Sequence, residues 1–207
     1  MNRLLIIGAG GHGAVVAEAA AEAGLWREIL FLDDDRTTDS VLEFPIVGTT
    51  DQLESLADET SDIIVAIGDN RQRLSLCGEI AESGFRLATI IHPKACISPS
   101  ATLSSGTVVC ARAVINARAK LGGGCILNTG ATVDHDCIIE DGVHISPGAN
   151  LAGRVTVGEC TWIGIGSAVR EGVRIGHDVI AGAGSAIVSD VNDGETVVGV
   201  PAKRIAT

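Results

Sequence analysis

The residues with the clearest catalytic potential are histidines in the second half of the chain. His135 lies between two carboxylates in the run Asp134-His135-Asp136. A histidine with a pKa near ~6.5 can take up and return a proton at neutral pH, which suits acyl transfer from a thioester to an amine or a hydroxyl. Either carboxylate could orient the ring, although an adjacent residue reaches it only where a corner interrupts the strand. The alternative is a solvated surface histidine.

A metal site is a weaker interpretation of the same cluster. Asp134, His135, Asp136 and Cys137 are consecutive, and adjacent strand residues point to opposite faces, so they cannot converge on one ion. The cysteines show no CxxC pair and no zinc-type spacing. We therefore predict no metal, no disulfide framework and no acyl-enzyme nucleophile beside His135. We expect all the cysteines to be small core residues: Cys77, Cys96, Cys110, Cys125, Cys137 and Cys160.

A second chemical signal is the glycine-rich run Gly8-Ala9-Gly10-Gly11-His12-Gly13, which follows an apolar strand and opens a helix. Asp33 stands twenty residues after Gly13, so the run forms a complete dinucleotide fingerprint. Only about ninety residues precede the next region, enough for one mononucleotide-binding half but not for two. We therefore reject NAD and predict a nucleoside diphosphate at the helix N-terminus. A purely structural glycine turn is the alternative.

The first half of the chain must position this loop. Apolar strands at 4–7, 29–32, 63–67 and 87–91 alternate with helices at 15–23 and 71–82. This alternation predicts a small Rossmann-like α/β domain over residues 1–92. Open α/β sheets bind ligands at the carboxyl ends of their strands. The residues that follow two strand ends at that edge are Asp33, Asp34, Gly68, Asn70 and Arg71.

The second half, residues 93–207, changes to a period of six. Fourteen aliphatic residues follow at six-residue intervals, each with a compact residue four positions later. This period fits neither a helix nor an ordinary sheet, and it predicts a β-solenoid with three six-residue strands per triangular coil. The aliphatic positions are Ile97, Leu103, Val109, Ile115, Leu121, Leu127, Val133, Ile139, Ile145, Leu151, Val157, Ile163, Val169 and Ile175.

The solenoid register decides where the histidines point. Residues eighteen apart stack, so His135 lies between Ala117 and Gly153 and occupies neither inward slot. We expect its ring to face solvent or a neighbouring subunit. His144 comes nine residues later, half a coil away, and therefore lies on another side of the prism. The spacing favours a site between subunits of a symmetric oligomer.

These motifs resemble a known family. The hexapeptide pattern is similar to that of hexapeptide-repeat acyltransferases, which implies a left-handed, trimeric helix. Three segments resemble bacterial nucleotide-sugar N-acetyltransferases, including bacillosamine-pathway, GDP-perosamine and sialic acid O-acetyltransferase enzymes. The segments are 127–137 (LNTGATVDHDC), 144–147 (HISP) and 198–203 (VGVPAK). The likeness covers essentially the whole chain.

The resemblance implies acetyl-CoA as co-substrate and a role for each matching residue. His135 is the general base, and Asp136, where some relatives have Glu, is its acidic partner. On acetyl-CoA the resemblance places Asn128, His144, Gly153, Ile165, Ala183 and Lys203. Ala183 replaces a Gly of some relatives and must leave its N–H accessible, and Lys203 has the alternative of a solvated tail lysine. On the nucleotide sugar it places Gly10, Gly11, His12, Gly13, Asp33, Asp34, Gly68 and Asn70.

Composition limits the remaining choices. The net charge of −11 argues against nucleic-acid or membrane-surface binding. No apolar stretch is long enough to span a membrane, and we expect a cytoplasmic protein.

The predicted function is N-acetylation of a UDP- or GDP-linked 4-amino-deoxysugar by direct transfer. The alternatives are O-acetylation of sialic acid or a related sugar, and a non-catalytic sugar-nucleotide-binding protein. The sequence does not distinguish UDP from GDP or identify the sugar.

Overall fold

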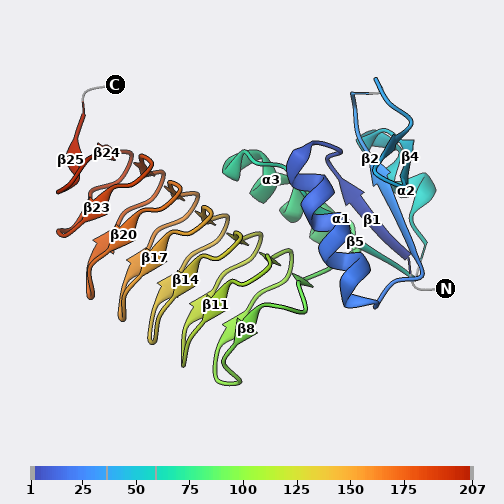
Figure 1. Ribbon diagram of the computed structural model, residues 1–207. Coiled ribbons are helices and arrows are strands. Elements are labelled where there is room, and N and C mark those ends of the chain that lie inside the picture. The colour runs from blue at the N-terminus through green and yellow to red at the C-terminus, as the bar shows by residue number, and fades with distance from the viewer. Residues whose placement is uncertain (1–2, 36, 59, 206–207) are drawn as a thin grey trace.

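The computed structural model describes residues 3–35, 37–58 and 60–205. An α/β domain lies beside the first coils of a solenoid, and the coils continue away from it to the C-terminal end (Figure 1). The predicted combination of an α/β domain with a β-solenoid is therefore confirmed.

The α/β domain is built on one twisted sheet with strand order β3-β4-β2-β1-β5-β6. β3 runs antiparallel to β4, and the other neighbouring strands are parallel. The strands are β1 (Arg3–Ile7), β2 (Glu28–Leu32), β3 (Ser40–Val41), β4 (Phe44–Gly48), β5 (Ser61–Val65) and β6 (Arg86–Leu87). The strands expected at 4–7 and 29–32 are confirmed, and the one expected at 63–67 begins and ends two residues earlier.

Helices cover both faces of this sheet. α1 (Gly11–Ala23) packs on the face that carries Leu4 and Ile6, whereas α3 (Asn70–Glu82) packs on the face that carries Leu5 and Ile7. A 3-10 turn (Thr50–Gln52) and α2 (Leu53–Leu56) lie on the α3 side. Both long helices were predicted, although α1 begins four residues before the expected start. Within the described ranges, no helix is long and apolar enough to cross a membrane.

The strand expected over 87–91 is wrong as a single element. The structure splits it into β6, which pairs with β5, and β7 (Ile90–Ile91), which pairs with β10 in the solenoid. The chain changes partners between them, because Ala88 N–H donates to Ile63 O and Ile90 N–H donates to Thr107 O. An apolar run of five residues does not show such a change of partner.

The solenoid consists of three parallel sheets of short strands, typical of a left-handed parallel β-helix. Partners are eighteen residues apart, as in Val108↔Ile126 and Thr132↔Asn150, so the expected coil length is confirmed. We call the sheets C, D and E. Sheet C contains β7, β10 (Val108–Val109), β13 (Ile126–Leu127), β16 (His144–Ile145), β19 (Trp162–Ile163), β22 (Ile180–Ala181), β24 (Thr196–Val198) and the antiparallel β25 (Lys203–Arg204).

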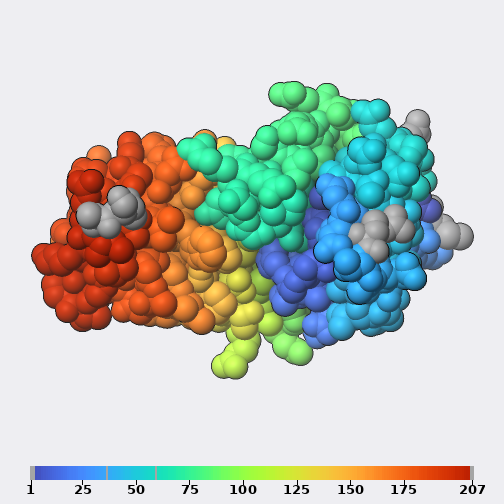
Figure 2. Space-filling view, turned by 90° about the horizontal axis from the view of Figure 1, so that it is seen from above, coloured from blue at the N-terminus to red at the C-terminus, as the bar shows by residue number. Residues whose placement is uncertain are grey.

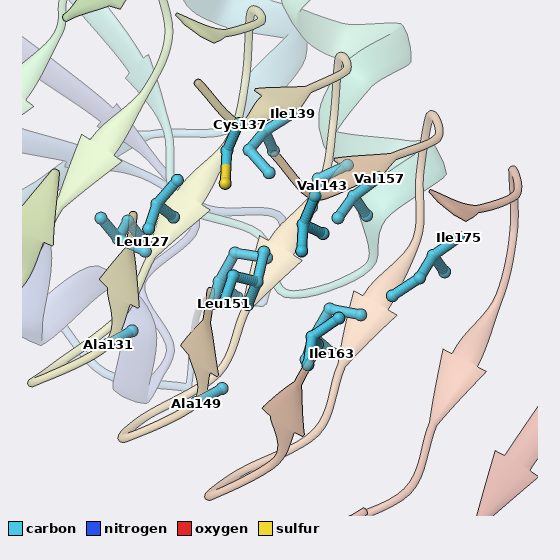
Figure 3. Packing of buried hydrophobic residues seen from close by; sticks show 14 of the residues in the cluster. Leu127, Ala131, Cys137, Ile139, Val143, Ala149, Leu151, Val157, Ile163 and Ile175 are labelled. Carbon is cyan, nitrogen blue, oxygen red and sulfur yellow. The ribbon is translucent and has the colours of Figure 1, made fainter. Parts of the chain in front are cut away.

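Sheets D and E complete each coil. Sheet D contains β8 (Cys96–Ile97), β11 (Val114–Ile115), β14 (Thr132–Val133), β17 (Asn150–Leu151), β20 (Ala168–Val169) and β23 (Ala186–Ile187). Sheet E contains β9 (Thr102–Leu103), β12 (Lys120–Leu121), β15 (Ile138–Ile139), β18 (Thr156–Val157) and β21 (Arg174–Ile175). From β8 to β24 the second residue of each strand points inward, and Figure 3 shows Leu127, Leu151, Ile163 and Ile175 converging on the prism axis. Burial of each such side chain contributes about 1.5–3 kcal/mol.

One expectation about the core needs correction. Five of the six cysteines are buried and all are free, but Cys96 is exposed. Cys96 is the first residue of β8, and in a two-residue strand the first side chain points outward when the second, Ile97, points in.

Candidate active site

The first part of the candidate site is the corner between β14 and β15. His135 lies on this corner with 43% of its side chain exposed, and its Nδ1 is 2.8 Å from Oδ2 of Asp136. Asp134 instead accepts the backbone N–H of His135 at 2.7 Å. The choice that the sequence left open is therefore settled geometrically in favour of Asp136 as the partner of the ring.

The backbone explains how adjacent residues meet. Asp136 has a φ of 59°, in the left-handed region, so the corner breaks the strand alternation and turns the carboxylate toward the ring. With the carboxylate accepting from Nδ1–H, the lone pair of His135 Nε2 is free to take a proton. A Cβ on Gly153 would lie 2.6 Å from Cε1 and Nε2, so glycine leaves the room that the ring occupies.

The second part is the outer face of sheet C. His144 is 8% exposed and stacks on Trp162 with ring centroids 5.3 Å apart. Its Nε2 lies 3.1 Å from Nδ2 of Asn128, which donates. Burial first, and then repulsion by Arg73 and by the protonated form of His12, lower the pKa of His144 to about 3. His144 is therefore a neutral ring at physiological pH, able to donate a hydrogen bond from Nδ1 but unsuited to hold a charge.

An open groove of about 390 Å³ follows this face toward the C-terminal coils. Ile165 and Ala183 border it, eighteen residues apart at the same corner. Among the residues that the structure describes, the N–H groups of both donate to no protein acceptor. The condition placed on Ala183 is therefore met. The groove is lined by His144, Ser146, Pro147, Trp162, Gly164, Ile165, Ile180, Ala181, Gly182 and Ala183.

One protomer keeps these two parts apart. His144 and the groove belong to sheet C, whereas His135 and Gly153 lie on corners between sheets D and E. Lys203 is exposed on β25, opposite Val198, and does not line the groove. The separation of the two histidines by half a coil is observed as expected, and the roles of the acetyl-CoA residues stay predictions.

The glycine-rich loop is the third part, in the α/β domain. Gly8 has a φ of 105°, and a Cβ on Gly13 would lie 2.1 Å from Gly8 O, so both positions require glycine for backbone reasons. A Cβ on Gly10 or Gly11 would meet open space. Gly10 caps α1 without a side-chain bond, which leaves the N-terminal N–H groups of the helix available to an anion.

The acidic residues at the end of β2 hold loops in place. Oδ2 of Asp33 accepts the N–H of Ala9 in the glycine loop, and Oδ1 accepts the N–H of Asp35 at 2.7 Å. Oδ1 of Asp34 accepts the N–H of Thr50 at 2.8 Å. The carboxylates border the loop as expected, but they already accept backbone hydrogen bonds. Their contact with a nucleoside stays a prediction.

The domain junction involves an arginine that the sequence analysis did not single out. Arg73 on α3 is fully buried and donates to the carbonyl oxygens of Gly124 and Gly142, at 2.7 and 2.8 Å, across the junction. It also donates to Ile67 O at 3.0 Å and Gly68 O at 3.3 Å. Figure 2 shows the green α3 segment lying over the solenoid at this junction. The carbonyl of Gly68 is therefore used inside the protein.

Asn70 differs from its expected role. It is 8% exposed, and its Nδ2 donates to Cys160 O at 2.9 Å and Thr161 O at 3.2 Å in the solenoid. Its Oδ1 accepts from Arg73 at 2.9 Å. These bonds use the amide to fix the junction, and its contact with a nucleotide sugar stays a prediction. The exposed Arg71, expected at the same edge, pairs with Asp178 of the solenoid.

His12 connects the glycine loop with the junction. Nε2 of His12 and Nδ1 of His144 are buried and have no hydrogen-bond partner among the described residues. Burial, and then Arg73, lower the pKa of His12 to about 4. His12 and Arg73 also lower the pKa of His144. The charge of Arg73 therefore disfavours protonation of both histidines.

The cysteines offer no nucleophile at the His135 corner. Cys137 is fully buried, its Sγ donates to Ala152 O at 3.2 Å, and burial raises its pKa. Among the described residues, no group of three or more His, Cys, Asp or Glu side chains could hold a metal ion. The chemistry that this corner supports is therefore proton transfer by a histidine and carboxylate pair.

Two residues of the site were missed although their spacing could have revealed them. Trp162 follows His144 by eighteen residues, and Arg118 precedes Asp136 by eighteen, so each stacks directly on a predicted site residue. Arg73, by contrast, shares the buried face of α3 with Cys77 and Ile80, but helical spacing alone does not distinguish a buried arginine from one at the edge of that face.

A solenoid with a paired histidine and carboxylate at one corner and a groove along one face is typical of the hexapeptide-repeat acyltransferases. Similarity to known proteins narrows this class. The family model described as the PglD N-terminal domain matches residues 3–80. The acetyltransferase domain of PglB from Neisseria gonorrhoeae FA1090, solved with acetyl coenzyme A, is 51% identical, covers 99% of both chains and has a TM-score of 0.96.

Two further similar proteins are also described as sugar N-acetyltransferases or solved with their ligands. PerB from Caulobacter crescentus, solved with CoA and GDP-perosamine, is 41% identical over 100% of this chain and 98% of its own, with a TM-score of 0.94. The UDP-N-acetylbacillosamine N-acetyltransferase of Bacillus subtilis (strain 168) is 36% identical over 110 residues, which span 52% of this chain and about half (51%) of that protein. The chain belongs to the PglD family of nucleotide-sugar N-acetyltransferases.

Proposed function

We propose that this protein transfers the acetyl group of acetyl-CoA to the amino group of a UDP- or GDP-linked 4-amino-deoxysugar. The observation that carries the proposal is the partly exposed His135, whose Nδ1 is held by Asp136 while Nε2 has no hydrogen-bond partner among the described residues. The likeness to enzymes solved with acetyl coenzyme A and with GDP-perosamine supports the substrate class. Two structures of the Caulobacter enzyme with CoA and GDP-perosamine carry a replaced histidine, which fits a catalytic imidazole.

The reaction is direct. Nε2 of His135 accepts a proton from the sugar amine, either before attack or as the tetrahedral intermediate collapses. The amine nitrogen forms the amide bond to the acetyl carbon, the carbon–sulfur bond breaks, and the CoA thiolate leaves and takes up a proton. The absence of a reactive thiol at the corner, where Cys137 is fully buried, supports a mechanism without an acyl-enzyme.

Different parts of the chain bind the two substrates. We place the nucleotide diphosphate at the open glycines Gly10 and Gly11 and the N-terminus of α1, where unpaired N–H groups favour an anion. We place the pantetheine arm in the sheet C groove, where the N–H groups of Ile165 and Ala183 remain free. Acetyl-CoA and nucleotide sugars are both cytoplasmic metabolites, and we propose that location for the reaction.

The active unit is a homotrimer with sites between subunits. His135 and the groove lie on different sides of one prism, so the base of one protomer can reach the groove only of its neighbour. Sedimentation at assay concentrations should give a trimer. A fully active monomer would contradict this part of the proposal.

The activity is tested by release of free CoA thiol in the presence of UDP- and GDP-linked 4-amino sugars, with free sialic acid as the comparison. Turnover with one of the amino-sugar nucleotides and none with sialic acid is expected. Turnover with sialic acid alone would replace N-acetylation by O-acetylation, and no thiol release with any acceptor would reject the enzyme assignment.

A further inference from the structure

The carboxylate beside His135 has a second partner one coil away. Arg118 precedes Asp136 by eighteen residues, and the two have left-handed backbones with φ of 61° and 59°. Nε of Arg118 donates to Oδ1 at 2.7 Å, and its Nη2 donates to Oδ2 at 2.9 Å. A planar guanidinium bound through two parallel hydrogen bonds fixes a carboxylate in position and orientation.

The cation, the carboxylate and the imidazole form one connected chain. Oδ2 of Asp136 accepts from Arg118 and also lies 2.8 Å from Nδ1 of His135. We propose that Arg118 is a positioning residue for acetyl transfer. It holds Asp136 against the His135 ring and partly neutralises the charge of this carboxylate. This inference rests on the proposed function, in which His135 is the base.

The geometric effect comes from the two-point contact. A carboxylate held only by the ring could rotate away, and the imidazole would then lose its fixed orientation and tautomer. The two parallel hydrogen bonds from Arg118 prevent that rotation. Asp136 thus keeps the proton of His135 on Nδ1, and the lone pair of Nε2 remains available to accept a proton.

The electrostatic effect comes from the charge of Arg118. A lone carboxylate stabilises the imidazolium and raises its pKa, whereas a cation bound to that carboxylate opposes the increase. The contact with Arg118, more than the one with His135, holds the pKa of Asp136 well below its usual range. The carboxylate therefore stays ionised at acidic pH and remains able to accept the hydrogen bond from Nδ1 of His135.

The other charged groups around the ring have hydrogen-bond partners of their own. Asp134 accepts the backbone N–H of His135 and, at 2.9 Å, Nδ2 of Asn116 from the coil below. Arg154, one coil above, is 3.2 Å from Glu171. Arg118 is thus the cation bound to the carboxylate that the ring uses. Arg154 provides a matched control, since it stacks on the same corner but pairs with a different carboxylate.

The direct test measures the pKa of His135 by NMR in the full-length protein. The chain has five histidines, so a His135→Gln variant assigns the signal. Arg118→Gln should raise this pKa by roughly half a unit to one unit, as loss of a cation bound to the neighbouring carboxylate at an exposed corner predicts. Arg118→Lys keeps the charge and should leave the pKa near the wild-type value. Arg154→Gln should also leave it unchanged.

Kinetics provide the second measurement. In Arg118→Gln, kcat should fall roughly 10-fold or more with little change in the KM for acetyl-CoA, since ring placement and not binding is lost. The acidic limb of kcat/KM should move to higher pH together with the NMR value. Arg118→Lys should return the acidic limb of kcat/KM to its wild-type position but restore only part of kcat, because lysine lacks the two parallel hydrogen bonds of the guanidinium. Circular dichroism should show that the variants, changed at an exposed side chain, remain folded.

The outcomes separate this inference from the proposed function. If Arg118→Gln leaves both the pKa and kcat unchanged, or if Arg154→Gln shifts the pKa equally, the positioning role of Arg118 is wrong. If wild-type protein releases no thiol with any acceptor, the proposed function fails, and the NMR titration still decides whether Arg118 controls the ring.

Discussion

Replacement of Arg73 should loosen the junction between the two domains. Its guanidinium is fully buried and donates to five oxygen atoms, two of them in the solenoid. Arg73→Met removes every donor but leaves each acceptor in place. The buried carbonyls of Gly124 and Gly142 would then lack their partner across the junction.

The size of the effect follows from two opposing contributions. Removal of a buried cation recovers its desolvation cost, which favours the variant. Each buried acceptor left unsatisfied costs about 1–3 kcal/mol, and several are affected at once. The second contribution is larger, so we expect Arg73→Met to lower the free energy of unfolding by roughly 3–5 kcal/mol. Arg73→Lys, with three donors, should have a free energy of unfolding between those of the wild type and Arg73→Met.

The chain provides its own reporters for this experiment. Trp26 belongs to the α/β domain, and Trp162 lies on sheet C, so Trp162→Phe and Trp26→Phe backgrounds report each domain separately during urea unfolding. The control is Arg71→Gln, an exposed neighbour on the same helix. In Arg73→Met the Trp26 transition should move to lower urea and separate from the Trp162 transition. A loss below about 1 kcal/mol, with coincident transitions, would refute the proposed role of Arg73.

Three further perturbations follow from the site. His135→Ala should reduce kcat/KM by about 10²–10⁴-fold with little change in oligomeric state, measured by thiol release and sedimentation, and a loss below tenfold would argue against a general base. Gly13→Ala should destabilise the α/β domain by about 2 kcal/mol or more, since its Cβ would lie 2.1 Å from a backbone oxygen, whereas thermal melting should show Gly11→Ala near wild type. Burial lowers the pKa of His12 to about 4 and that of His144 to about 3. The contribution of these neutral rings to the free energy of unfolding should therefore be complete above pH ~6.5 and decrease as the pH falls toward these values. The decrease should reach up to about 1.4 kcal/mol per pH unit for each ring. Denaturation at several pH values checks this slope, which His144→Gln should reduce, and a slope that does not change would contradict it.

The solenoid was predictable because its signal is periodic. A prism with three inward strands per coil admits one aliphatic side chain every six residues, so the pattern determines both the fold and the stacking of residues eighteen apart. The same periodicity correctly turned His135 outward and separated it from His144. It could also have identified Arg118 and Trp162, if the eighteen-residue spacing had been applied to charged and aromatic side chains.

The remaining features depend on contacts that no local pattern records. The hairpin of β3 and β4 is short and partly polar, so it was not predicted from hydrophobic alternation. The choice between Asp134 and Asp136 depends on the left-handed backbone of one corner residue. Asn70 was placed at the nucleotide because it follows a strand, yet its neighbour in space is the solenoid. Such tertiary partners decide the role of a polar residue after the local pattern has placed it.

The central claim is that the base of one protomer acts on acetyl-CoA held by the next. Two variants test it together: His135→Ala, which lacks the base, and Ala183→Trp, which fills the groove. Each alone should be nearly inactive. Co-expressed with different tags and purified as mixed trimers, they should recover about one third of wild-type thiol release, since every mixed trimer pairs an intact base with an intact groove at one of its three sites. Recovery no greater than the sum of the separate variants would contradict an active site shared between subunits.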